Sequence, residues 1–311
     1  MLVNEGGTML DVCLLGTGGM LPLPDRWLTS LLLRYNGKML LLDCGEATQI
    51  PLKLCGWGFK SIGMVLFTHY HADHIAGLPG FLLTLGNSGR EEPLTLIGRP
   101  GLEAVVKSLL VIAPRLPFGI NFVELPDNQV THMEYEDIYI SSMPVDHWLP
   151  CLAYSFETKR LRKFDRTKAE SLKIPVQYWK RLHLGETVTF EDKVIKPEMV
   201  TGEHRNGVKL SYCTDSRPVT ALAEFIKGSD LFICEGMYGD KDESPKAIEK
   251  KHMLFSEAAM LAQRGEVKEL WLTHYSPSLK NPGDHITRAT AVFENSIAAG
   301  DLMKKSIRPQ A

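Results

Sequence analysis

The sequence contains no apolar run of about 18 residues or more, which is the length that a membrane-spanning helix requires. Its first residues, MLVNEGGTML, carry neither a basic segment nor a long apolar segment, so they do not predict a signal peptide. The six cysteines are scattered along the chain without a Cys-x-x-Cys pair, a usage typical of reduced thiols. These absences favour a cytoplasmic protein that is not inserted in a membrane.

A strong net charge is also absent, since 35 Lys and Arg residues oppose 37 Asp and Glu residues and leave a formal charge of −2. The whole chain therefore gives no general sign of nucleic-acid binding, although a local basic patch would be enough for it. What is present is 44% hydrophobic content over 311 residues, which can bury one large core or two smaller ones.

The most informative stretch is THYHADHIAGL, at positions 68–78. It places three histidines and one aspartate within six positions: His69, His71, Asp73 and His74. The apolar run 63–67 before it predicts a buried strand, and 75–85 after it predicts a helix. His69 and His71 alternate along extended backbone and can point to one spot, whereas Asp73 and His74 follow the turn and can serve a second. This arrangement suits two metal ions that share one loop.

Apolar runs and helical segments alternate along the rest of the chain. Strands are predicted at 10–15, 30–35, 38–43, 94–97, 121–124, 133–135, 139–145, 209–214, 231–234 and 269–273, and a helix at 102–112. Asn36-Gly37 is a strong hairpin signal between two of these strands. The polar turn that begins at Asp43 opens a further helix, and capping that helix is the simplest role for Asp43. Strands mixed with peripheral helices predict an α/β fold of two packed sheets with helices outside.

Three later strands end in further residues of the metal-binding type: His147, Asp215 and His274. Because several strand ends deliver such residues to one sheet edge, we expect them to join the histidine-rich loop. Imidazoles with a few carboxylates suit Zn²⁺, and they also tolerate Mn²⁺ or Fe. Two ions about 3.5–4 Å apart stabilise both the attacking and the leaving oxygen of a phosphodiester displacement. The histidines outside this pattern are expected at the surface: His132, His183, His204 and His285.

On these motifs the chain resembles ribonuclease Z, the tRNA 3′-processing endonuclease branch of the metallo-β-lactamase fold. The similarity runs from Leu15-Gly16-Thr17-Gly18-Gly19 to 299–303, and it is most specific at 43–49, 69–80 and 273–276. It implies a four-layer αββα sandwich with two mixed sheets, built by one domain over residues 1–311. It also implies a cytoplasmic homodimer with two Zn²⁺ per chain that cleaves the 3′ trailer from precursor tRNA.

The resemblance also implies a role for each site residue. One ion would take His69, His71, His147 and Asp215, and the other would take Asp73, His74, His274 and the same Asp215 as a bridge. A bridging water would lose its proton near neutral pH and attack the phosphodiester, with Asp73 orienting it or taking the proton. His252 would help the leaving 3′-oxygen depart, and Glu235 would orient His252 and raise its pKa. Otherwise His252 would be an exposed residue of a Lys-rich loop.

A basic segment, 158–207, interrupts the strand order between His147 and Asp215. In ribonuclease Z an arm that grips the tRNA body protrudes from this place, and basic side chains near aromatics can bind phosphates and stack on bases. On composition alone a solvated charged helix would be the favoured interpretation of this segment. The residues expected to contact substrate are Lys159, Arg160, Arg162, Lys163, Arg166, Lys180 and Arg181.

Some substrate-side positions depart from the family's pattern: Val176-Gln177, Met253-Leu254 and Ser278-Leu279. Two alternatives therefore stay open beside the endoribonuclease. One is another hydrolase of this fold that acts on a small phosphodiester, a sulfate or another ester, although a small substrate would not need a basic arm. The other is an RNA-binding relative with weak catalysis, although the complete set of metal ligands opposes that interpretation.

Overall fold

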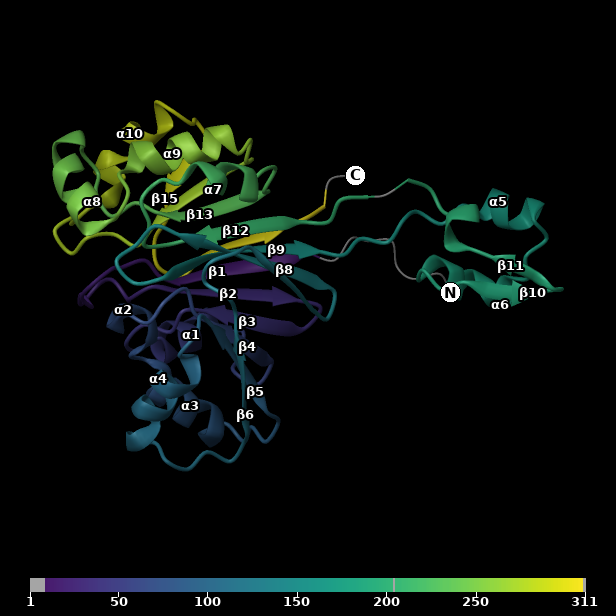
Figure 1. The fold of residues 1–311 in the computed structure, drawn as a ribbon, viewed down its shortest axis with the longest axis horizontal. Helices are drawn as coiled ribbons and strands as arrows, with labels where there is room; N and C mark the ends of the chain where they lie inside the picture. Colours follow the sequence, from purple (N-terminus) through teal and green to yellow (C-terminus); the bar gives the residue numbers. More distant parts are fainter. Residues whose placement is uncertain (1–8, 204, 310–311) are drawn as a thin grey trace.

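Two seven-stranded sheets lie face to face at the centre of the molecule (Figure 1). The computed structural model describes residues 9–203 and 205–309, so His204 and most of the segment considered for a signal peptide lie outside the described residues. The first sheet has the order β16 (Met303–Ile307), β1 (Leu10–Gly16), β2 (Ser30–Tyr35), β3 (Lys38–Leu42), β4 (Ile62–Leu66), β5 (Leu94–Gly98) and β6 (Ile120–Glu124). The second has the order β15 (Ser296–Ala298), β14 (Leu270–Thr273), β13 (Leu231–Glu235), β12 (Lys209–Cys213), β9 (Cys151–Thr158), β8 (Ile138–Val145) and β7 (Thr131–Tyr135).

Both sheets are mixed in the same way. In the first sheet, β16, β1, β2 and β3 pair antiparallel, and the pairs from β3 to β6 are parallel. In the second sheet, β7, β8, β9 and β12 pair antiparallel, and the pairs from β12 to β15 are parallel. The carboxyl ends of neighbouring parallel strands meet at one edge of a sheet, and this is what gathers residues from distant parts of the chain.

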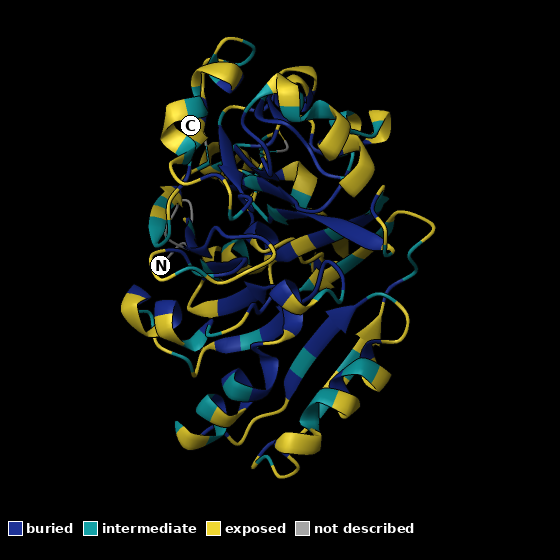
Figure 2. Cartoon of the chain, turned by 90° about the vertical axis from the view of Figure 1, so that its left-hand side faces the viewer, coloured by how far each residue is buried: buried dark blue, intermediate teal, exposed yellow. Residues whose placement is uncertain are grey.

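Helices cover the outer face of each sheet. On the first sheet lie α1 (Gln49–Cys55), α3 (Leu78–Asn87) and α4 (Leu102–Leu109), and on the second lie α7 (Thr220–Phe225), α8 (Ser244–Lys250), α9 (Phe255–Arg264) and α10 (Thr287–Thr290). Figure 2 shows the strands buried and the outward helix faces exposed. This confirms the predicted four-layer αββα sandwich. Within the described residues, no helix is both long enough and apolar enough to span a membrane.

The central strands are nearly continuous apolar runs because both of their faces are buried. In β2, Leu31 and Leu33 point into the core between the sheets, whereas Leu32 points into the core beneath the helices. Alternate residues of a strand face opposite sides of the sheet, so a strand between two cores needs apolar side chains at every position.

The helix predicted at 75–85 is two helices in the structure. A short α2 (Ala72–Ile75) lies in the histidine-rich loop, and α3 begins at Leu78. The break lies at Gly77, where a Cβ atom would stand 2.0 Å from the carbonyl oxygen of Gly45. The turn after β3 packs so closely here that the helix direction changes, and α2 can aim its side chains at the sheet edge.

The basic segment forms a small module that projects from the body (Figure 1). It holds α5 (Arg166–Ser171), α6 (Val176–His183) and a hairpin of β10 (Val188–Phe190) and β11 (Lys193–Ile195). Its own apolar core contains Phe164, Leu182 and Ile195, with Trp179 packed against it. His183, which was predicted at the surface, is 6% exposed beside the Phe164 ring. That prediction was wrong because the module folds around its own core.

We expect Trp179→Ala to unfold this arm (residues 158–207) and leave the body folded. The indole lies 5.5 Å from the Phe164 ring and donates a hydrogen bond to the carbonyl oxygen of Ile174. Losing it should cost about 3 kcal/mol, the lower end of the range for truncating a core aromatic. Hydrogen exchange should accelerate across the arm only. Val176→Ala, at a position of α6 that is 71% exposed, is the matched control, and slow exchange retained in Trp179→Ala would contradict the prediction.

Candidate metal centre

The seven predicted ligands meet at one edge of the two sheets. His69 and His71 lie in the loop after β4, and Asp73 and His74 lie in α2. The other three lie one or two residues after β8, β12 and β14: His147, Asp215 and His274. All are buried except the half-buried His71. The edge of the sandwich therefore carries a single cluster of imidazoles and carboxylates.

Four of these side chains converge as a first ligand group, namely His69, His71, His147 and Asp215. His71 Nδ1 lies 2.8 Å from His69 Nε2 and 3.3 Å from His147 Nε2. Asp215 Oδ2 lies 3.7 Å from His69 Nε2 and 3.6 Å from His147 Nε2. Four atoms that can each donate an electron pair thus surround one point.

A second ligand group consists of Asp73, His74 and His274. Asp73 Oδ2 lies 3.6 Å from His74 Nε2 and 3.3 Å from His274 Nε2. Asp215 Oδ1 lies 3.1 Å from each of the same two nitrogens. Asp215 therefore turns one carboxylate oxygen to each group, which is the geometry that a bridging ligand requires.

The cluster fits metal ions on three counts. Asp215 Oδ1 is buried and accepts no hydrogen bond. A tetrahedral ion with ligands at about 2.0–2.1 Å places neighbouring ligand atoms roughly 3.3 Å apart, and the separations in the first group run from 2.8 to 3.7 Å. The donor set of imidazoles with carboxylates is the set that zinc takes in proteins.

The electrostatics of the cluster also call for positive charge. Burial alone would raise the pKa of Asp215, but the imidazoles of His274 and His74 hold it well below its usual range. Burial alone would lower the pKa of His74, yet three carboxylates raise it well above its usual value: those of Asp215, Asp73 and Asp43. The site thus favours ionised carboxylates with a cation among them, and a proton or a metal ion can supply that charge.

Asp43 supports the cluster by contacting His74 on the side away from the ligand groups. Its predicted role as a helix cap is wrong. Helix α1 begins after Thr48 without a side-chain cap. Asp43 is instead fully buried, lies 2.9 Å from His74 Nδ1 through Oδ2, and accepts hydrogen bonds from the backbone and hydroxyl of Thr68. A carboxylate behind a ligating histidine fixes its ring orientation and tautomer. Asp43 follows a strand, as several of the ligands do. This position is the signal that could have identified Asp43 as part of the site.

Three residues of the site have left-handed backbone: Asp43 (φ 55°), Asp215 (φ 44°) and His274 (φ 55°). Each stands one or two residues after a strand, where the turn of the chain aims its side chain back over the sheet edge. Such conformations cost a non-glycine residue of order 1–3 kcal/mol, so the surrounding structure must enforce them. Strain of this kind at three converging strand ends is typical of a functional site.

The glycine-rich turn after β1 closes over the second ligand group. A Cβ atom at Gly19 would stand 2.7 Å from Cε1 of His274, so only glycine lets the turn lie against that ring. The backbone N–H of Met20 then donates a 2.7 Å hydrogen bond to Asp73 Oδ2. Here the first strand of the chain and one of its last strands fix the same ligands.

His252 is buried beside both ligand groups, so its alternative placement in an exposed loop is wrong. Its ring lies 5.1 Å from that of His147 and 5.6 Å from that of His274, and it is 7% exposed. Glu235 Oε2 lies 3.0 Å from His252 Nδ1, and Oε1 accepts the backbone N–H of Ser216. Burial alone would lower the pKa of His252, but the Glu235 carboxylate raises it to about 9.

Sequence reasoning missed a second support of His252. The Arg217 guanidinium donates to the carbonyl oxygen of His252 and forms two hydrogen bonds with Glu257, at 2.9 and 2.5 Å. Glu257 also accepts the backbone N–H of Leu254. The pair fixes the backbone on both sides of Met253. Neither residue belongs to a recognisable motif, and only the fold brings them together.

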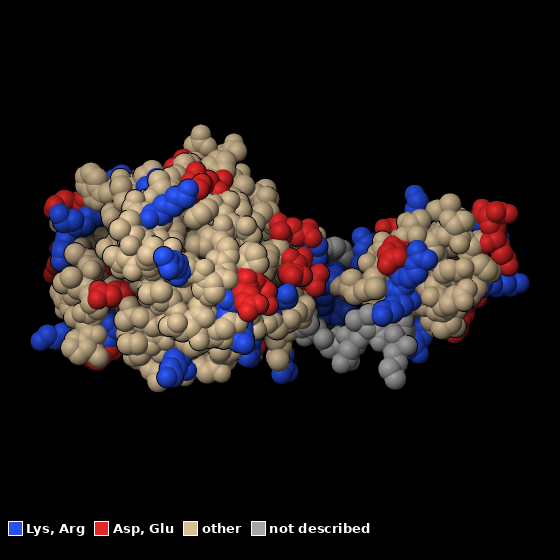
Figure 3. All heavy atoms as spheres, turned by 90° about the horizontal axis from the view of Figure 1, so that it is seen from below, with Lys and Arg blue, Asp and Glu red and all other residues tan. Residues whose placement is uncertain are grey.

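The structure does not bring the predicted substrate-contact residues to the metal centre. Lys180 and Arg181 are exposed on α6, and Lys159 at the root of the arm pairs with Glu134 of the body. The remainder are Arg160, Arg162, Lys163 and Arg166, in the same arm and its root. Figure 3 shows basic and acidic side chains interspersed on the visible face of the arm.

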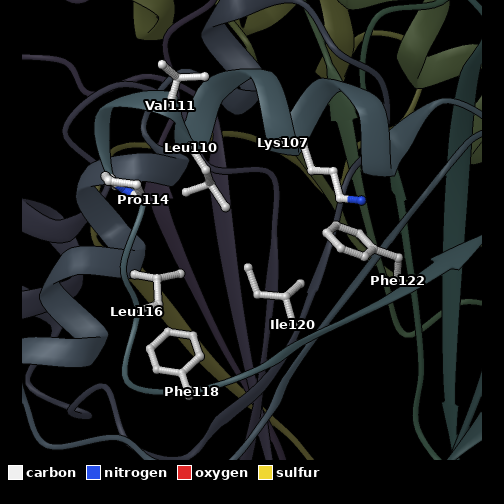
Figure 4. A pocket seen from close by; sticks show the side chains of 9 residues that line it. Lys107, Leu110, Val111, Pro114, Leu116, Phe118, Ile120 and Phe122 are labelled. Carbon is white, nitrogen blue, oxygen red and sulfur yellow. The ribbon is translucent and has the colours of Figure 1, made fainter.

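An apolar hollow of about 420 Å³ lies elsewhere, beside the edge strand β6 (Figure 4). Its wall consists of residues such as Leu110, Val111 and Phe122, with Lys107 beside them. None of the seven ligands lines it. The candidate metal ligands therefore lie at another edge of the sandwich and not in this hollow.

A four-layer αββα sandwich whose strand ends carry this ligand set defines a protein of the metallo-β-lactamase fold. The solved structure of human tRNase Z, short form, shares this fold with a TM-score of 0.69 and 23% identity, covering 96% of this chain and 99% of that one. A family described as Anti-Pycsar protein Apyc1 matches residues 10–109 only.

The chain belongs to the ribonuclease Z family. It is 54% identical over 299 residues to Ribonuclease Z of Clostridium kluyveri, covering 96% of this chain and 99% of the relative. It is 55% identical over 293 residues to Ribonuclease Z of Lachnospira eligens, covering 94% and 96%. The resemblance inferred from the strand-end ligands and the polar turn at Asp43 is thereby confirmed.

We expect Asp43→Asn and Asp215→Ala to affect metal binding differently. Loss of the carboxylate behind His74 should weaken binding 10- to 100-fold, the usual effect of changing a residue that orients a ligand. Loss of Asp215 should lower occupancy in both groups, because both of its oxygens are used. Elemental analysis and competition with a chelator measure the two effects. Full occupancy of both groups in Asp215→Ala would contradict the bridging geometry.

Proposed function

We propose that this chain is an endoribonuclease that removes the 3′ trailer of precursor tRNA with the help of two Zn²⁺ ions. The observation that carries the proposal is Asp215, whose two oxygens face two adjacent ligand groups. Family membership favours RNA over a small ester as the substrate. The altered pair Met253-Leu254 is buried in the core, so these side chains do not contact the substrate. This favours an active enzyme over an RNA-binding relative with weak catalysis.

When bound, two zinc ions supply the charge that stabilises both oxygens of the displacement and lower the pKa of a water. The chain provides the proton transfers. Asp73 lies between His74 and His274 and takes the proton of the attacking water. His252 donates a proton to the departing 3′-oxygen, held in place by Glu235 and Arg217. The P–O3′ bond breaks as the new P–O bond forms, leaving a 3′-hydroxyl on the tRNA and a 5′-phosphate on the trailer.

We propose that the enzyme is a cytoplasmic homodimer, and the position of the arm supports the dimer. Strand β9 begins at Cys151, whose sulfur lies 3.7 Å from His69 Nδ1, and it ends at Thr158 where the arm departs. Eight residues at about 3.4 Å each separate these points by roughly 25 Å, and the arm projects further away (Figure 1). A tRNA held by one arm is therefore better placed for the metal centre of a second chain than for that of its own.

One experiment tests the proposal directly. The purified protein is incubated with end-labelled precursor tRNA that carries a 3′ trailer, and separately with bis(p-nitrophenyl) phosphate. We expect a single endonucleolytic cut with a 3′-hydroxyl and a 5′-phosphate at the new ends. Rapid hydrolysis of the aryl diester with no cut in the tRNA would favour the small-ester alternative instead.

We expect His252→Ala to slow precursor cleavage by about 10²–10⁴-fold, the usual contribution of a general acid. It should slow the aryl diester far less, because nitrophenolate leaves without a proton. Glu235→Gln should move the alkaline limb of the kcat/KM profile to lower pH. His252 acts while it is protonated, and Glu235 is what raises its pKa. His132→Ala, at an exposed histidine, is the control. Equal losses on both substrates in His252→Ala would remove the acid role.

We expect replacing residues 160–206 by a short Gly-Ser turn to abolish tight tRNA binding and preserve aryl diester hydrolysis. The ends of the excised segment are adjacent, since the N–H of Thr158 donates to the carbonyl oxygen of Val208 at 2.9 Å. Mixing this variant with Asp215→Ala should restore cleavage, because in the mixed dimer the arm of one chain serves the intact metal centre of the other. No restoration in a mixture that forms heterodimers would show that each arm serves its own chain.

A further inference from the structure

One tryptophan remains exposed to solvent beside the metal centre. Trp148 directly follows the ligand His147 and is 64% exposed. The structure describes all five tryptophans, and the others are half-buried or buried: Trp27, Trp57, Trp179 and Trp271. Burial of an indole stabilises the folded state strongly, and an exposed indole does not provide this stabilisation. Trp148 therefore contributes little to the core, and its position next to a ligand asks for another explanation.

The surroundings of Trp148 connect it to both halves of the site. Lys251 Nζ lies 5.6 Å from the centroid of its ring and 2.7 Å from Asp146 Oδ1. The carbonyl oxygen of Lys251 accepts a hydrogen bond from His147 Nδ1 at 3.1 Å. Lys251 is the residue before His252 and has left-handed backbone (φ 55°). The indole thus lies at the junction of the first ligand group and the loop that carries His252, with a cation beside it.

An exposed aromatic ring with a neighbouring cation is the combination that binds unpaired nucleotides. Bases stack on aromatic side chains, and basic groups accompany the phosphates of the strand. Stacking occurs with any base but is stronger for one with a larger ring system. The predicted substrate-contact residues all lie in the arm or its root, and none of them follows a strand end at the metal centre. Trp148 is placed to bind the nucleotide at the cut itself.

We propose that Trp148 is a base-stacking residue that binds the nucleotide whose 3′-oxygen leaves. The proposal rests on the proposed function. The leaving oxygen lies at His252, and the Lys251 backbone links that residue to the segment of Trp148. The base on the leaving side of the phosphate is therefore the one within reach of the indole. A purine at this position offers the larger stacking surface, so Trp148 also makes the enzyme prefer a purine immediately before the cut.

The test combines variants of the enzyme with altered substrates. Wild type, Trp148→Ala and Trp148→Phe are each given precursor tRNA that is unmodified, abasic at the nucleotide before the cut, or abasic at the first trailer nucleotide. We expect Trp148→Ala to lower kcat/KM on the unmodified tRNA on the order of 10- to 100-fold, corresponding to the loss of one stacked base. Trp148→Phe should retain most of the activity, since a phenyl ring still stacks.

The abasic substrates locate the stacked base. Removing the base before the cut should cost wild type as much as Trp148→Ala does and cost Trp148→Ala nothing further. Removing the first trailer base should affect both enzymes equally. Metal content and thermal unfolding should be unchanged in Trp148→Ala. Val111→Ala, at a residue that is 75% exposed beside β6 and away from the site, is the matched control.

The outcomes separate this inference from the function on which it rests. A wild-type enzyme that leaves precursor tRNA intact would overturn the proposed function and the stacking proposal with it. Cleavage by wild type together with an unchanged kcat/KM in Trp148→Ala would overturn the stacking role alone. A loss in Trp148→Ala that persists on the abasic substrate would also overturn it, because the indole would then act without a base. The fluorescence of Trp148 is the difference between wild type and Trp148→Ala. If the abasic precursor quenched it as strongly as the intact precursor does, the stacking role would also be overturned.

Discussion

The structure depends on one electrostatic constraint, which is that seven electron-pair donors are held against one another in a buried place. Their atoms approach to as little as 2.8 Å, and at Asp215 Oδ1 no hydrogen bond separates them. Carboxylates and imidazoles so close together are stable only with positive charge among them. The fold resists their separation through parallel strands that end at the same edge, left-handed backbone at three strand ends, and Asp43 behind His74.

The molecule consists of a sandwich that holds these donors together and an arm that takes no part in holding them. The central strands of each sheet are buried on both faces, and the candidate ligands lie on strand ends and the turns that follow them. The arm shares no core with the sandwich; its apolar cluster is separate and is connected through two strands. In the proposed function, substrate binding and phosphodiester cleavage therefore belong to different parts of the chain. The loop of His252 and the separate segment of Trp148 both lie beside the metal centre.

Local patterns predicted most of the fold and the ligands, because a buried strand and the residue after it are visible in a short window. What was missed depends on distant contacts. Strand β16 reads Met-Lys-Lys-Ser-Ile and is a strand only because it pairs with β1 from the other end of the chain. Arg217 supports His252 through a partner 40 residues away. His183 looked polar and solvated, but the arm folded a core around it. No window of sequence contains such information.

The order in which the ligands occur along the chain has a consequence for biosynthesis. A ribosome delivers the histidine-rich loop early, His147 next and Asp215 later, so the first ligand group is complete while His274 has not yet been translated. The second group must wait for β14, and the turn at Gly19 that closes over it must wait as well. A nascent chain thus carries every residue of the first ligand group while the second group still lacks His274.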